Sequence, residues 1–210
     1  MPRPRTYEGE AIAISFDMSR CIHARNCFLK LPRVFDPARR PWVDPDAAPA
    51  EEIAAMIRTC PSGALTFARR DGGCDEQPPR INRVSVWENG LLAVAGDLTL
   101  GDDRMQRATL CRCGMSKIKP YCDYSHVEAA FHATGEPAEA EGAPQEPGPL
   151  EITARENGPL VLIGPAEVTT GTGRRVKQAG KLFLCRCGHS KNKPFCDGSH
   201  KEAGFNADPV

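Results

Sequence analysis

The stretch LCRCGMSKIKPYCDYSH at residues 110–126 returns as LCRCGHSKNKPFCDGSH at residues 184–200, 74 positions further along the chain. The two copies are identical at 13 of 17 positions, so the chain contains an internal repeat. Each copy has the same spacing: Cys-x-Cys, eight residues, Cys, three residues, His. The repeat therefore defines two candidate donor sets, which are Cys111, Cys113, Cys122 and His126, and then Cys185, Cys187, Cys196 and His200.

The composition explains why so small a protein would need such donors. The 210 residues are 6% aromatic and 40% hydrophobic, and they include 19 Gly, 19 Pro and 10 Cys. Small modules of this kind bury too little apolar surface to be stable by burial alone, so we expect metal or covalent links. The sequence shows no secretory signal and no apolar run of about eighteen residues, which favours a cytoplasmic protein without a membrane anchor.

The cellular compartment and the charge narrow the chemistry further. In a reducing cytosol, closely spaced cysteines indicate metal or cluster ligands before disulfides. The 27 basic and 27 acidic residues balance. We therefore expect neither nucleic acid nor an anionic membrane surface as a partner.

The segments on either side of each repeat predict local structure. An Asn-Gly turn signal and a β-rich apolar run precede each copy, as ENGLLAVAGDLTL from Glu88 and ENGPLVLIGPAEV from Glu156. After each copy, a serine stands before a helix-permissive run, so each histidine is expected in the first turn of a short helix. Each repeat is thus a β-rich module that ends in a ligand loop.

The N-terminal part of the chain follows a different pattern. Alternation of Ile12, Ile14 and Phe16 predicts a strand, and residues 49–59 predict a helix. We expect an α+β protein built of small modules. The expected organisation is a domain at 1–70, a linker at 71–80, a module at 81–133, a solvated linker at 134–149 and a module at 150–210.

The ligand count alone does not name the metal of the repeated sites. Three thiolates and one imidazole satisfy a tetrahedral zinc ion as readily as an iron–sulfur cluster, so a structural zinc protein is one alternative. Zinc sites more often separate their cysteines by two to four residues, whereas the Cys-x-Cys spacing suits two ligands of one iron.

Both repeats resemble the CDGSH iron–sulfur domain family, the mitoNEET-like proteins. The resemblance rests on Cys-x-Cys-x-x-Ser and Pro-x-Cys-Asp-x-Ser-His, and residues 196–200 read CDGSH letter for letter. It implies a [2Fe-2S] cluster at each site, with one iron on the Cys-x-Cys pair and the other on the later cysteine and the histidine. Family members with one motif are homodimers, so two motifs in one chain imply an intramolecular pseudo-dimer, for which a monomer is the expected form.

The first copy departs from the family at one position. Tyr124 stands where the family has glycine, as Gly198 does in the second copy. If this position requires a positive φ or a close backbone approach, the tyrosine strains the loop.

A third candidate set lies near the N-terminus. Cys21 and Cys27 occur in CIHARNC, and Cys60 begins CPSGAL. Bacterial ferredoxins use Cys-x2-Cys-x2-Cys and a remote Cys-Pro, but position 24 here is alanine. The segment from about Ala11 to Phe67 resembles a divergent single-cluster ferredoxin-like domain.

The resemblance implies an N-terminal cluster of either three or four irons. Three cysteines suit a [3Fe-4S] cluster, whereas a [4Fe-4S] cluster needs a fourth ligand, for which His23 and Cys74 are the candidates.

These sites predict an electron or cluster carrier. A neutral imidazole makes a cluster less negative than four thiolates would, and this raises its reduction potential. The expected partner is a redox protein or a cluster acceptor, and a redox or pH sensor is the alternative. The sequence has no nucleophile with an oriented base and no nucleotide loop, so we do not expect an enzyme.

Overall fold

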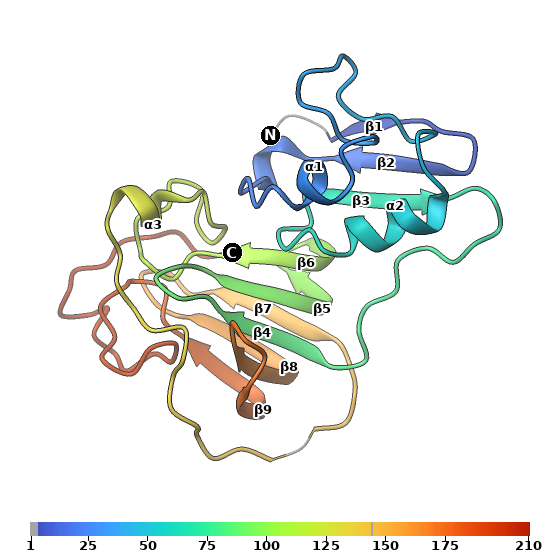
Figure 1. The fold of residues 1–210 in the computed structure, drawn as a ribbon. Helices are drawn as coiled ribbons and strands as arrows, with labels where there is room; N and C mark the ends of the chain where they lie inside the picture. The colour runs from blue at the N-terminus through green and yellow to red at the C-terminus, as the bar shows by residue number, and fades with distance from the viewer. Residues whose placement is uncertain (1–3, 144) are drawn as a thin grey trace. The chain divides into compact units, whose positions relative to one another are not determined.

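The computed structural model describes residues 4–143 and 145–210 (Figure 1). The fold is mostly β, with few and short helices, so the α+β expectation gave the helices too large a share. The chain divides into two compact units, one ending at Gln77 and the other running from Pro78 to Val210. Within the described residues, no helix combines the length and the apolar character that crossing a membrane requires.

The first unit is built on a small antiparallel sheet in the order β1-β2-β3. The central strand buries Ile12 and Ile14 completely, which confirms the strand predicted from their alternation. The strands are β1 (Arg5–Tyr7), β2 (Ile12–Phe16) and β3 (Leu65–Arg69), and the helical elements are η1 (Met18–Arg20), α1 (Asn26–Lys30) and α2 (Ala50–Ile57).

Helix α2 forms where the sequence predicted a helix, because its apolar positions recur at helical spacing. Ile53 and Ile57 lie one turn apart and are both fully buried. Two acidic residues, Glu51 and Glu52, occupy the first turn, where they complement the helix dipole. The helix stops before Pro61, which disfavours helical geometry in the residue that precedes it.

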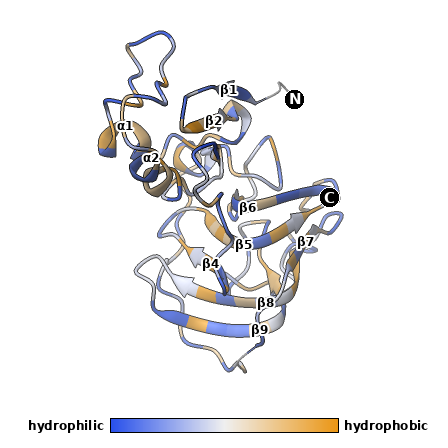
Figure 2. Cartoon of the chain, turned by 90° about the vertical axis from the view of Figure 1, so that its right-hand side faces the viewer, coloured by the Kyte–Doolittle hydropathy of each residue, from blue (hydrophilic) through white to orange (hydrophobic). Residues whose placement is uncertain are grey.

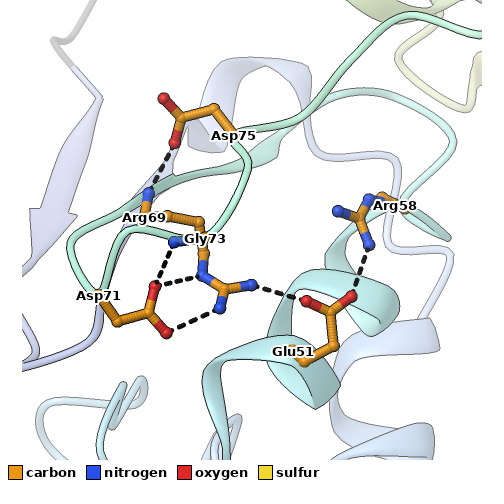
Figure 3. A network of polar contacts seen from close by, with 6 residues as sticks. All are labelled: Glu51, Arg58, Arg69, Asp71, Gly73 and Asp75. Carbon is orange, nitrogen blue, oxygen red and sulfur yellow. Dashed lines mark hydrogen bonds and ion pairs between the residues drawn. The ribbon is translucent and has the colours of Figure 1, made fainter.

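A cluster of charges closes the far end of β3 (Figure 3). The guanidinium of Arg69 bonds Glu51 of α2 at 2.7 Å and Asp71 at 2.7 and 2.9 Å, and its backbone N–H donates to Asp75 at 2.7 Å. The hydrogen bond from Arg69 lowers the pKa of Asp71 to about 2. These contacts hold the loop that carries Cys74, whose side chain is exposed.

The second unit contains the six strands of both repeats. The apolar runs that follow the two Asn-Gly signals form β5 and β8, as predicted, and Asn89 and Asn157 take positive φ in the turns. The elements are β4 (Asn82–Val86), β5 (Leu92–Leu100), β6 (Asp103–Leu110), α3 (Ser125–Glu128), β7 (Leu150–Ala154), β8 (Leu160–Thr170) and β9 (Arg175–Leu184).

The two repeats interleave their strands in one barrel-like sheet. Strand β4 pairs antiparallel with β5 and parallel with β8, while β7 pairs antiparallel with β8 and parallel with β5. Strand β6 flanks β5, and β9 flanks β8. Every pairing of the first repeat thus has a counterpart in the second, and Figure 1 shows green strands of one interleaved with orange strands of the other.

A single hydrophobic core results from this exchange of strands. Buried and more exposed residues alternate along β4, β5 and β7, and Figure 2 shows both hydrophobic and hydrophilic stretches along β8 and β9. Fully buried residues of the first repeat, Val84, Leu92 and Leu98, share a cluster with Leu150 and Leu162 of the second. Neither repeat encloses a core of its own.

The segment between the repeats was expected to be a solvated linker, and most of its described residues are exposed. It is nevertheless attached to the sheet. The backbone N–H of Ala140 donates to the carbonyl of Val176 at 2.9 Å, and Arg174 pairs with Glu136 at 3.3 Å. The segment therefore follows the side of β9.

Candidate iron–sulfur cluster sites

Strands β6 and β9 each run directly into a Cys-x-Cys loop, which folds back on its own strand. In the first loop the N–H of Cys111 donates to the carbonyl of Pro120 at 2.8 Å, and the N–H of Cys122 donates to that of Thr109 at 2.9 Å. Two distant cysteines are thereby brought side by side. The second loop has the same contacts, Cys185 to Pro194 at 2.7 Å and Cys196 to Phe183 at 2.9 Å.

The predicted donors lie close together in pairs. In the first site, 3.6 Å separates the sulfurs of Cys111 and Cys113, and 3.5 Å separates Cys122 Sγ from His126 Nδ1. The matching distances in the second site are 3.7 Å for Cys185–Cys187 and 3.4 Å for Cys196–His200. Two donor pairs per loop are what two irons bridged by sulfide require, so the residues present fit a [2Fe-2S] cluster.

No single-ion geometry accompanies these pairs. Among the residues that the structure describes, no group of three or more His, Cys, Asp or Glu side chains is arranged to hold one metal ion.

Not all of the cysteine thiols in the first site lose their protons unless a cation is bound. Contact with Cys113 lowers the pKa of Cys111 to about 6, while contact with Cys111, together with burial, raises the pKa of Cys113 far above its ordinary range. Burial raises the pKa of Cys122 to about 12. Bound iron would draw off these protons, because a coordinated thiol is deprotonated.

The aspartate of each CDGSH motif holds the loop rather than a metal. Asp123 accepts hydrogen bonds from the backbone N–H groups of Lys117 at 2.8 Å and Ser125 at 3.0 Å. Asp197 accepts the equivalent bonds from Lys191 and Ser199 at 2.8 and 3.0 Å. The motif thus fixes the spacing between its cysteine and its histidine.

The two sites differ at the position that departs from the family pattern. Tyr124 has φ +75° and Gly198 has φ +91°, so this position does require left-handed backbone and the tyrosine is strained. The Tyr124 ring lies edge-on to the His126 imidazole, with 4.8 Å between centroids. Burial and the positive charge of Arg112 lower the pKa of His126.

The short helix expected after each motif forms in the first copy alone within the described residues. His126 lies in α3, as predicted, whereas residues 198–204 form turns around His200. Among its described backbone bonds, the second segment makes one with the four-residue spacing of an α-helix, from Ala203 N to Ser199 O at 3.0 Å. One such bond fixes a turn and does not define a helix, so the second expectation was wrong.

The sequence reading missed the arginine inside each Cys-x-Cys motif, although its presence in both copies was a signal. Arg112 is 1% exposed, and its guanidinium donates to the carbonyls of Gly90 at 2.9 Å, Thr134 at 3.1 Å and Trp87 at 2.6 Å. Desolvation by burial lowers its pKa to about 10. Arg186 makes the equivalent bonds in the second repeat, to Gly158, Arg155 and Asp208.

The glycine after each Cys-x-Cys motif allows the two ligand loops to touch. A Cβ on Gly114 would lie 2.5 Å from the carbonyl oxygen of Cys187, and one on Gly188 would lie 2.4 Å from that of Cys113. Both glycines have φ +83°. The two candidate cluster sites are therefore neighbours.

The third predicted set surrounds a cavity of about 350 Å³ in the N-terminal unit. Cys21 follows η1, Cys27 lies in α1 and Cys60 follows α2, and all three line this cavity together with His23. Burial raises the pKa of Cys21 and of Cys27. A cavity with three thiols and an imidazole fits the iron–sulfur cluster expected for this part of the chain. Cys74 is exposed in the loop after β3 and is not among the described residues that line the cavity.

A side-chain bond keeps two of these cysteines in register. Asn26 Nδ2, next to Cys27, donates to the carbonyl of Thr59, next to Cys60, at 2.8 Å. Helix α1 is thus tied to the end of α2 across the cavity.

Comparison with known families places these sites in a class. Residues 7–70 match the family described as "Divergent 4Fe-4S mono-cluster", and residues 89–127 and 157–201 match "Iron-binding zinc finger CDGSH type". The chain therefore belongs to the iron–sulfur cluster-binding proteins, as a divergent 4Fe-4S mono-cluster domain followed by two CDGSH modules. The first description names a four-iron cluster, one of the two forms expected from the sequence.

Individual relatives agree with both parts. The "Uncharacterized protein YjdI" of Escherichia coli (strain K12) is 36% identical over 66 residues, which are 31% of this chain and 87% of that protein. The "CDGSH iron-sulfur domain-containing protein 2 homolog" of Drosophila persimilis is 50% identical over 36 residues, which are 15% of this chain and 27% of that protein.

Proposed function

We propose that this chain is a one-electron carrier with three clusters, and not an enzyme. The observation that supports this most is the pairing of donors in each CDGSH loop, at 3.4–3.7 Å. A [2Fe-2S] cluster takes up and releases a single electron without a substrate pocket. The physiological partner would be a redox protein.

The ligand assignment follows the donor pairs. In the first CDGSH site, Cys111 and Cys113 would hold one iron, and Cys122 and His126 the other. In the second site the pairs would be Cys185 with Cys187 and Cys196 with His200. In the N-terminal cavity, Cys21, Cys27 and Cys60 would hold a [4Fe-4S] cluster, with His23 as the fourth ligand because it lines the same cavity.

The chain's own charges tune such sites. Each imidazole replaces a thiolate, which leaves one negative charge fewer on the loop and favours the reduced state. Buried Arg112 and Arg186 add fixed positive charge within the Cys-x-Cys loops. The interleaved sheet supports the expectation that one chain forms the pseudo-dimer, without a second copy.

Anaerobic purification with metal and sulfide analysis tests the proposal. We expect a coloured protein with about eight irons and eight sulfides per chain, and EPR signals that appear and disappear in a reversible redox titration. Stoichiometric zinc without sulfide would instead establish the structural zinc protein. Clusters that break down at the first oxidation would contradict the carrier and favour a sensor.

A further inference from the structure

The two CDGSH sites are not equally covered. In the first, Cys122 and His126 are 4% and 8% exposed, and the Tyr124 ring contacts the imidazole edge-on. In the second, Cys196 and His200 are both partly exposed. Gly198 replaces the tyrosine there, and a Cβ at that position would meet nothing within 4 Å.

A groove opens beside the more exposed site. The groove has a volume of about 350 Å³, and Cys196 is one of its lining residues. The other lining residues belong to β9, to the ligand loop around Lys193 and to residues 137–140. Phe183, which is 39% exposed, and Phe195 provide its aromatic surface. We call this the basic groove, because Lys177 and Lys181 also line it.

Positive charge surrounds these aromatic rings. Lys177 Nζ lies 5.7 Å from the centroid of Phe195, and Lys181 Nζ lies 5.4 Å from that of Phe183. The guanidinium of Arg155 lies 5.7 Å from the Phe183 ring. Glu139 is the acidic side chain in the described lining, so the groove keeps a positive excess.

The first repeat does not provide this surface. At the positions 74 residues earlier, Lys177 corresponds to Asp103 and Phe183 to Thr109, which is 2% exposed. The counterpart of Arg155, which likewise precedes a Glu-Asn-Gly turn signal, is the uncharged Trp87. Lys181 corresponds to Arg107, which is 7% exposed, and Phe195 to Tyr121, so the second module differs in the charges of Lys177 and Arg155, in the exposure of Lys181 and in the presence of Phe183.

From this difference we infer that the second CDGSH site exchanges electrons with an acidic one-electron redox protein, which docks on the basic groove. The inference rests on the proposed carrier function and assigns its partner surface. Carboxylates of the partner would face Lys177, Lys181 and Arg155, and opposite charges across such an interface accelerate encounter. The partner gives up one electron and the second site gains it, with no bond made or broken in this chain.

Reduced flavodoxin, an acidic protein with a one-electron flavin, is a suitable probe. In a His126→Cys background the first site has four thiolates, so the spectrum of a [2Fe-2S] cluster with three thiolates and one imidazole reports the second site alone, distinct from the [4Fe-4S] cluster proposed for the N-terminal cavity. We expect Lys177→Glu/Lys181→Glu to slow reduction of the second site by flavodoxin about tenfold or more. Added salt should narrow this difference, because it screens exposed charges.

Arg104→Glu/Lys117→Glu is the matched control, because it makes the same charge change on exposed residues of the first module. It should leave the flavodoxin rate at the second site within about twofold, since neither residue is in the described lining of the basic groove and salt screens exposed charges. Lys177→Gln/Lys181→Gln should give an intermediate rate, so the comparison survives if the double reversal folds poorly. The inference would be overturned if the Lys177→Glu/Lys181→Glu and Arg104→Glu/Lys117→Glu variants slowed reduction by flavodoxin equally, or if neither variant slowed it.

A neutral photoreduced deazaflavin separates failure of the docking surface from failure of the carrier function. It should reduce the second site at the same rate in all these variants, because it has no charge to be attracted. If deazaflavin reduces the second site reversibly but the flavodoxin rate does not depend on the charges, the docking inference is wrong and the proposed carrier function stands. If neither donor reduces the site reversibly, both the docking inference and the carrier function are wrong.

Discussion

His200 and Arg112 illustrate two different ways in which single residues act on these sites. His200 contributes a donor atom 3.4 Å from Cys196, while Arg112 donates to backbone carbonyls and holds the loop from within. In the proposed ligand assignment, the first kind of residue would set the charge on a cluster, and the second sets the shape of the loop that would receive it. Substitutions should therefore have separable effects on reduction potential and on stability.

Replacing His200 with cysteine should keep the second cluster and lower its reduction potential, because a thiolate adds negative charge next to iron. The expected decrease is on the order of 100 mV, given the potentials that separate His-ligated from all-thiolate clusters. Spectroelectrochemical titration measures it. His189→Gln, in the same loop, should leave the potential unchanged, and an unaltered potential in His200→Cys would show that His200 is not a ligand.

Replacing Arg112 with glutamine should destabilise the second unit. The change removes the buried guanidinium that donates to the carbonyls of Gly90, Trp87 and Thr134, and breaking a buried charged network costs about 3 kcal/mol. Urea unfolding followed by circular dichroism measures the loss, and Arg186→Gln should match it. Exposed Arg104→Gln is the reference, and equal stability of the Arg104 and Arg112 variants would contradict the prediction.

Among the elements, those with local signals were predictable from the sequence. The Asn-Gly turns, the alternation in β2 and the helical spacing in α2 are short-range patterns, and all three formed where expected. The parallel pairing of β4 with β8 joins residues 84 positions apart, as in Val84 with Val168, and no local pattern encodes it. Resemblance to a dimeric family supplied the idea of an exchange between repeats.

The candidate sites were predictable for a similar reason. The eight CDGSH donors lie in two short motifs, so their spacing in the sequence largely determines their spacing in space. The choice between His23 and Cys74 depends instead on the path of the chain after β3, which is held by the ion pair of Arg69 with Asp71 and the hydrogen bond from the Arg69 backbone N–H to Asp75. Those contacts had no recognisable sequence pattern.

The close contact between the two ligand loops can be tested by substitution of their glycines. Gly114→Ala and Gly198→Ala both place a side chain at positive φ, which costs about 1 kcal/mol each. Gly114→Ala also forces a Cβ to 2.5 Å from the Cys187 carbonyl oxygen, whereas Gly198 has open space. Thermal unfolding should show a larger loss of stability, by about 1 kcal/mol or more, for Gly114→Ala. Equal losses would mean that the loops do not meet closely.

For the molecule as a whole, the interleaved sheet predicts that half of the second unit cannot fold alone. A fragment of residues 78–143 lacks the parallel partners of β4 and β5 and exposes Leu92 and Leu98 of the shared core. Sedimentation and circular dichroism should find it either unfolded or paired as a homodimer, while residues 78–210 should form a folded monomer. A folded monomer of 78–143 would contradict the prediction.

The covalent joining of the two repeats also affects how each can vary. In an assembly of identical subunits, any replacement is made twice, so an aromatic cover on one cofactor imposes the same cover on the other. Here Tyr124 has Gly198 as its counterpart in the other repeat, and Asp103 in β6 has Lys177 in β9. Carrying both repeats in one polypeptide thus leaves each half free to specialise, and dilution cannot separate them.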